Sequence, residues 1–215
     1  MEYRYINILC EGQSEESFIK KILAPYLEMK GIYMKPIVLG GVSRYSGIRK
    51  ELKRLGRDSS AFLTTMLDFY KLPQDVPGVR QYKHEKKAEP EMIASDIEKR
   101  IRENLKDHLA CKDFLPYIQM HEFEALLFSD INGFRQIGMS PPVIDKLEKE
   151  VKKFPTPEHV NNSEQTAPSK RILKLYQDYQ KVSDGTIVAE VVGIRTMIEK
   201  CPHFAGWVKK LEELG

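Results

Sequence analysis

Three apolar runs in this chain each end on a carboxylate, and helical patterns separate them. The runs and their acids are residues 6–10 with Glu11, residues 61–67 with Asp68, and residues 114–121 with Glu122. Between the second and third runs, residues 91–109 place an isoleucine or leucine at every fourth position, which is typical of an amphipathic helix. Strands that alternate with helices favour a parallel sheet with helices on both faces. We therefore predict an α/β fold with a mostly parallel central sheet.

The three acids are expected to lie at one edge of this sheet. Open α/β sheets bind ligands at the carboxyl ends of their strands, and neighbouring strands lie about 4.8 Å apart. Acids that follow adjacent strands can therefore share one hard cation, which proteins hold with one or two carboxylates, waters and substrate phosphates. The pattern predicts a Mg²⁺ or Mn²⁺ site formed by Glu11, Asp68 and Glu122.

The residues around these acids refine the prediction. Gly12 follows Glu11 and opens a helix, which leaves room for a cation or a phosphate, although a strand–helix turn that simply uses glycine is the alternative. Glu124 follows two residues after Glu122. If that segment is already helical, the two side chains point about 200° apart. We then expect one of them to act at the site and the other to be structural.

Length and composition set the outer limits of the fold. The chain has 215 residues, of which 41% are hydrophobic and 30% charged. No apolar stretch approaches the roughly 18 residues that cross a bilayer, and the N-terminus lacks a signal-peptide pattern, so we expect a cytoplasmic protein without a membrane partner. Strands are expected only before residue 130. We therefore predict a core over 1–130 and a helical extension over 131–215, packed together as a single globular unit.

The charge of the chain gives a weaker indication of a ligand. A net charge of +3 does not by itself indicate nucleic acid, but basic residues cluster. Arg49 and Arg54 lie on one predicted helix, and Lys170 and Arg171 open another. These four are candidates for phosphate contacts, with solvated helix faces as the alternative. P-loop, serine-hydrolase and dinucleotide-binding motifs are absent from the sequence.

The chain resembles a known but uncharacterised prokaryotic family, domain-of-unknown-function family 4276, over nearly its full length. The matching segments are CEGQSEESF, TTMLDFYKLP, YIQMHEFEALLFSD, EQTAPSKRI and CPHF. The first of them is also similar to the first motif of Toprim domains, with Glu11 as its acid. Asp68 stands where that fold has the leading acid of a second Asp-x-Asp motif, but Tyr70 replaces the last acid. Glu122 or Glu124 would then supply the missing carboxylate.

This resemblance implies a Toprim-like fold and a Mg²⁺-dependent nuclease, with Glu11, Asp68, Glu122 and Glu124 as its catalytic acids. It also implies a partner ATPase and a role in defence against foreign DNA. Because of Tyr70, the alternative is a non-enzymatic Toprim-like subunit that binds nucleic acid or a partner protein. A third hypothesis is acid chemistry on a small phosphorylated metabolite, which the modest charge allows.

Overall fold

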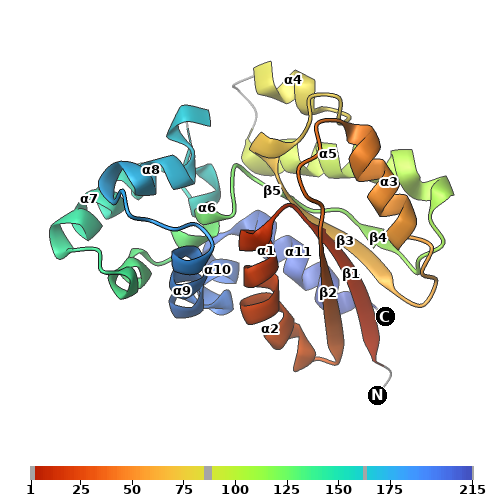
Figure 1. The fold of residues 1–215 in the computed structure, drawn as a ribbon, viewed down its shortest axis with the longest axis horizontal. Helices are drawn as coiled ribbons and strands as arrows, with labels where there is room; N and C mark the ends of the chain where they lie inside the picture. The colour runs from red at the N-terminus through yellow and green to blue at the C-terminus, as the bar shows by residue number, and fades with distance from the viewer. Residues whose placement is uncertain (1–2, 85–88, 162–163, 215) are drawn as a thin grey trace.

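The computed structural model describes residues 3–84, 89–161 and 164–214, and a parallel sheet lies at its centre (Figure 1). The strands are β1 (Arg4–Cys10), β2 (Ile32–Val38), β3 (Phe62–Asp68), β4 (Phe114–Leu115) and β5 (Ile118–Gln119). Their order is β2-β1-β3-β4, and β5 pairs with the end of β3. All of these pairs are parallel. The predicted α/β fold with a mostly parallel sheet is confirmed.

Helices cover both faces of the sheet, so its central strand is buried along its whole length. On one face lie α1 (Gln13–Phe18) and α2 (Ala24–Glu28), joined by a π-helical turn (Ile19–Leu23), together with the last helix, α11 (Pro202–Glu213). On the other face lie α3 (Tyr45–Leu55) and α5 (Pro90–Leu105). A strand covered on both faces needs apolar side chains on both sides, which explains the continuous apolar run of β3.

The predicted strand over residues 114–120 is divided into two short pieces. Pro116, which has no backbone N–H to give to a ladder, interrupts it. The hydroxyl of Thr65 on β3 replaces the missing ladder, because it donates to the carbonyl oxygen of Tyr117 and accepts from the Tyr117 N–H, each at 2.8 Å. Side-chain bonds thus keep this segment beside β3 where backbone bonds cannot.

Shorter helical elements fill the connections. The connection after Asp68 contains a 3₁₀ turn (Phe69–Lys71) and α4 (Val79–His84), while its residues 85–88 lie outside the described part of the chain. Further 3₁₀ turns are Lys106–His108, Ile131–Ile137, Pro157–His159 and Glu164–Thr166. None of the helices in the described ranges is long and apolar enough to cross a membrane.

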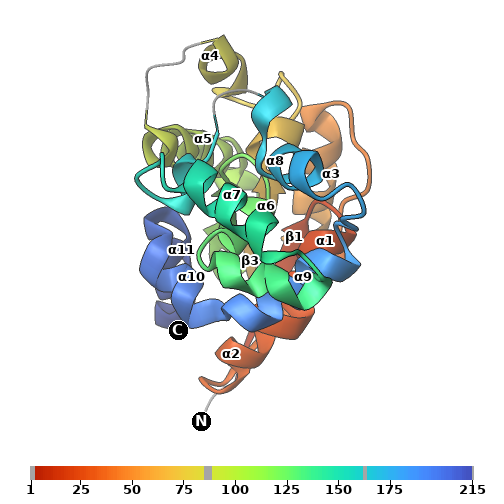
Figure 2. The ribbon, with the colours of Figure 1, turned by 90° about the vertical axis from the view of Figure 1, so that its left-hand side faces the viewer.

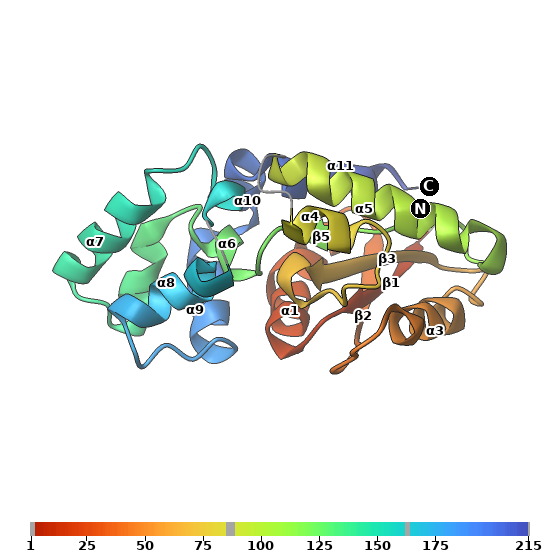
Figure 3. The same ribbon diagram turned by 90° about the horizontal axis from the view of Figure 1, so that it is seen from above.

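The remaining helices form a group beside the end of the sheet at which the strands finish (Figures 1 and 3). They are α6 (Glu124–Leu127), α7 (Pro141–Val151), α8 (Pro168–Leu175), α9 (Ser183–Val192) and α10 (Ile194–Lys200). Seen from the side in Figure 2, they stand in front of the sheet. The helical pattern of residues 186–199 is interrupted at Gly193, which has a φ of 75° and separates α9 from α10.

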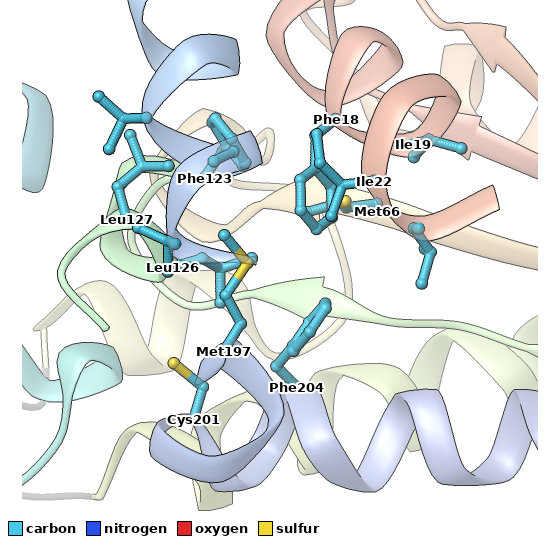
Figure 4. Close-up of a cluster of buried hydrophobic side chains, with 14 of the residues drawn as sticks. Phe18, Ile19, Ile22, Met66, Phe123, Leu126, Leu127, Met197, Cys201 and Phe204 are labelled. Carbon is cyan, nitrogen blue, oxygen red and sulfur yellow. The ribbon is translucent and has the colours of Figure 1, made fainter. Parts of the chain in front are cut away.

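A shared apolar core joins these helices to the sheet. Phe18 of α1, Met66 of β3, Phe123 and Met197 converge there, and Phe204 of α11 closes the cluster (Figure 4). The final helix then runs back along the sheet, where the indole N–H of Trp207 donates to Thr64 Oγ1 on β3 at 2.9 Å. The division at residue 130 remains a prediction, with α11 packed on the strands of the first part.

Candidate functional site

Five carboxyl groups gather at the carboxyl edge of the sheet. They are Glu11 after β1, Glu15 on α1, Asp68 at the end of β3, and Glu122 and Glu124 after β5. The register places Cys10 of β1 opposite Met66 of β3, so the two strands end side by side. Asp68 is only 5% exposed and Glu124 only 2%. The structure therefore brings together the four acids that the sequence singled out and adds Glu15.

Backbone N–H groups hold three of these carboxylates in place. Glu11 Oε2 accepts the Asp68 N–H at 3.3 Å, which joins the ends of β1 and β3. Glu15 Oε2 accepts the Gly12 N–H at 2.9 Å and so caps its own helix. Glu122 Oε2 accepts the Ser169 N–H at the start of α8, also at 2.9 Å. Gly12 thus contributes to the cluster through its backbone N–H, which binds Glu15.

Among the described residues, Lys181 forms ion pairs inside the cluster, and the charge of Lys71 also acts on Glu11. Lys181 Nζ lies 3.3 Å from Glu122 Oε1 and 3.4 Å from Glu124 Oε1. The two glutamates were expected to point apart if their segment was helical. They face the same cation instead, because α6 begins only at Glu124 and the chain turns just before, at His121, with a left-handed φ of 67°. Lys181 could not be predicted from the sequence, because its segment carries no motif.

Burial and mutual repulsion raise the pKa values of several of these acids. Burial, followed by repulsion from Glu15, raises the pKa of Glu11 from 4.5 to about 7. Burial likewise raises the pKa of Glu124 to about 7. Burial and the neighbouring carboxylates raise the pKa of Asp68 well above its ordinary value. Asp68 Oδ1 is buried without a hydrogen-bond partner in the described ranges. A bound cation or a proton would satisfy that oxygen.

Tyr70 follows two residues after Asp68, where the sequence resemblance led us to expect a further acid. Its ring stacks on His121, with the ring centroids 5.4 Å apart. Burial lowers the pKa of His121 to about 4, so this imidazole is neutral at physiological pH. Tyr70 and His121 thus form an aromatic pair at the turn that leads to Glu122.

The strand-end acids would suit a hydrated ion better than a closed protein cage. Among the described residues, Glu89, Glu91 and His159 form a group of three metal-ligating side chains. Their donor atoms all lie within 4.8 Å of one another. The strand-end acids are spread more widely. Mg²⁺ needs only one or two carboxylates, since waters and phosphates complete its shell. The neighbouring pair of Glu11 and Asp68, with its unpartnered oxygen, meets that requirement.

Glu89, Glu91 and His159 could hold a second ion. His159 Nε2 lies 3.1 Å from Glu89 Oε2 and 3.9 Å from Glu91 Oε2. Thr156 Oγ1 lies 2.7 Å from His159 Nδ1 and so fixes the ring. This group could not be predicted from the sequence, because its histidine lies about seventy residues from its acids.

The predicted phosphate-binding residues lie in two other places. Arg49 and Arg54 are on α3, where Arg54 pairs with Glu51 at 2.8 Å and the Arg49 guanidinium lies over the Tyr45 ring. Neither lines the cavity of about 200 Å³ that opens beside Glu11. Lys170 and Arg171 follow Ser169 on α8 and line a separate cavity.

Comparisons with known proteins identify similarity at two levels. The model of a family described as Domain of unknown function (DUF4276) matches residues 10–212. No curated protein matches the chain. Among solved structures, a similar one is the C-terminal region of the Burkholderia pseudomallei OLD protein. Its identity to this chain is 15% and its TM-score 0.47, over 99% of this chain and 98% of that one.

Proposed function

The chain belongs to the DUF4276 family, and we propose that it is a divalent-metal-dependent phosphodiesterase that acts on nucleic acid. The observation that carries this proposal is the cluster of Glu11, Glu15, Asp68, Glu122 and Glu124 at the carboxyl edge of the sheet. Burying several carboxylates together is costly unless cations pair with them. A divalent cation would supply the charge that the fold leaves missing.

The acids differ in what they can do. Glu11 is partly exposed, borders a cavity and accepts the Asp68 N–H, so Glu11 and Asp68 are placed to hold one Mg²⁺ or Mn²⁺ ion. When bound, such an ion polarises a phosphoryl oxygen and activates water. The third predicted ligand, Glu122, is held by Lys181 and by the Ser169 N–H. Glu122 would therefore position Lys181 and the start of α8 rather than bind the ion directly.

Lys181 and Glu124 would contribute the remaining chemistry. The Lys181 side chain is 42% exposed, so its ammonium can hold Glu122 and Glu124 while it also faces a substrate phosphate. Glu124 has a pKa raised to about 7. A group that titrates near neutral pH is suited to accept or release a proton. We assign Lys181 to charge neutralisation and Glu124 to proton transfer.

A cleavage assay tests this proposal. Wild-type protein should cut single-stranded or double-stranded DNA or RNA with Mg²⁺ or Mn²⁺, and EDTA should abolish the activity. The double variant Glu11→Gln/Asp68→Asn should lose cleavage and metal binding measured by calorimetry. Glu16→Gln serves as a matched control, because Glu16 lies on the same helix and pairs with Lys20 outside the cluster. Equal cleavage by wild type and the double variant would refute the assignment.

A non-enzymatic subunit is the second candidate. The observation that favours it is Lys181, which already neutralises part of the charge of Glu122 and Glu124. In this case the protein would bind nucleic acid or a partner protein and would cleave nothing with any divalent metal. The partner ATPase and the role in defence remain part of either proposal. Co-purification of an ATPase with the tagged chain from its native host tests them.

A further inference from the structure

We propose that the cavity between α7 and α8, which we call the basic cavity, binds the phosphate groups of a nucleotide or nucleic acid strand. The cavity has a volume of about 400 Å³, within the range of about 300–1,000 Å³ that is usual for ligand sites. Five cationic side chains line it, and Glu150 is the acidic residue among its lining residues. The cations are Lys146, Lys149, Lys170, Arg171 and Lys174.

The lysines line the same cavity from two helices, and among the described residues they have no acidic ion-pair partner. Lys146 and Lys149 are three residues apart on α7, and Lys170 and Lys174 are four apart on α8, so each pair shares one helix face. In the described part of the chain, none of these four ammonium groups forms a salt bridge. A concave surface lined by one sign of charge concentrates counter-ions. The ligand that fits is an anion with several charges.

Arg171 and Glu150 form the wall of the cavity. The Arg171 side chain is only 11% exposed. Its Nε donates to the Thr166 carbonyl oxygen at 2.9 Å, and its Nη1 lies 3.2 Å from Glu150 Oε2. Its guanidinium also lies over the Phe154 ring. These contacts hold Arg171 in place, so its positive charge lies in the wall of the cavity. The exposed lysines are the groups that can contact a ligand.

Glu150 does not neutralise the basic cavity. Its other oxygen, Oε1, binds Lys153 at 2.5 Å, so this one carboxylate is shared between two cations. The hydrogen bond from Lys153, together with the nearby charges of Arg171 and Lys174, lowers the pKa of Glu150. The cavity thus keeps an excess of positive charge, and a phosphate-bearing ligand would compensate it.

Helix α8 contributes to both the basic cavity and the acid cluster. The Ser169 N–H binds Glu122, and the next residue, Lys170, lines the cavity. The start of α8 thus contacts Glu122 with one residue and lines the basic cavity with the next. The inference itself does not require the acid cluster to be catalytic, because binding by lysines needs no metal ion.

Binding measured in EDTA tests the inference without cleavage. The probes are a fluorescently labelled single-stranded DNA oligonucleotide, ATP and inorganic phosphate. The variant is Lys146→Gln/Lys149→Gln/Lys170→Gln/Lys174→Gln, which changes exposed side chains only. The control is Lys99→Gln/Lys209→Gln, which removes exposed lysines from α5 and α11. Circular dichroism confirms that both variants are folded.

We expect the wild type and the control to bind, and the four-lysine variant to bind at least tenfold more weakly. For the oligonucleotide, the slope of log affinity against log salt should fall by about 0.7 for each phosphate that the substituted lysines no longer bind. Weaker binding of DNA with unchanged binding of ATP identifies a strand as the ligand, and the reverse identifies a free nucleotide. Equal binding by the variant and the control, or no binding of any probe by wild type, would overturn the inference.

The binding assay in EDTA, together with the cleavage assay in Mg²⁺ or Mn²⁺ run on the same variants, separates this inference from the proposed function. Glu11→Gln/Asp68→Asn should keep wild-type affinity for the probe in EDTA, because the basic cavity is intact. If that double variant still cleaves while the lysine variant does not bind, the phosphodiesterase assignment fails and the cavity stands. If the lysine variant binds normally but the acid variant loses cleavage, the cavity fails and the assignment stands.

Discussion

Replacing Glu11 with glutamine should make the metal-free protein more stable at pH 8 than the wild type. The pKa of Glu11 is raised from 4.5 to about 7 by burial and by Glu15. Because the folded state holds this proton more tightly than the unfolded state, the stabilisation from Glu11 is complete below about pH 4.5 and is lost as the pH rises through about 7.

The magnitude follows from the same two pKa values. Each pKa unit corresponds to about 1.4 kcal/mol, so the ionisation of Glu11 in the folded state costs about 3 kcal/mol. Glutamine keeps the size of the side chain and removes the titration. Wild type in EDTA should therefore lose about 3 kcal/mol more stability between pH 5 and pH 8 than Glu11→Gln does.

Urea unfolding at pH 5, 6, 7 and 8 measures this difference. A divalent ion that binds the folded state should reverse the loss in wild type, by about 2.7 kcal/mol at a hundred times the dissociation constant. Glu11→Gln should gain less from the ion. Glu16→Gln, the half-buried neighbour on α1 that pairs with Lys20, should follow the wild type. Parallel stability curves for wild type and Glu11→Gln would refute the electrostatic account of the cluster.

Two further substitutions test the packing that supports the site. Glu158 is fully buried and accepts the N–H groups of His203 and Phe204 at the start of α11, each at 2.9 Å. Glu158→Ala should lower the free energy of unfolding by about 3 kcal/mol in urea, because two buried N–H groups lose their acceptor; a loss below about 1 kcal/mol would contradict this. Thr64→Val removes the acceptor of the Trp207 indole N–H. It should cost about 1–2 kcal/mol and shift the fluorescence of the chain's single tryptophan, whereas an unchanged spectrum would argue against the bond.

Local patterns in the chain were sufficient to predict the sheet and three of its strand-end acids. Apolar runs and helical periodicity depend on residues close in sequence, and parallel strands must finish at the same edge. Glu11, Asp68 and Glu122 could therefore be placed together from the order of residues alone. The position of each acid along its own strand carried that information.

The partners of these acids depend on contacts between distant segments. Lys181 meets Glu122 and Glu124 only because the segment after α8 folds back onto the turn at His121. Local patterns also do not show how the chain continues past Pro116 and Gly193. After Pro116, the hydroxyl of Thr65 on β3 holds the segment beside the sheet. At Gly193, the positive φ ends one helix before the next begins. The basic cavity likewise required two helices to pack side by side.

The sequence by itself determined the α/β class and the edge of the sheet where negative charge collects, since both follow from the order of residues within single elements. Only the tertiary structure decided how much of that charge is neutralised, and by which residue. The charge balance of a buried site depends on which distant side chains reach it and how far water is excluded. Both are properties of the packed molecule.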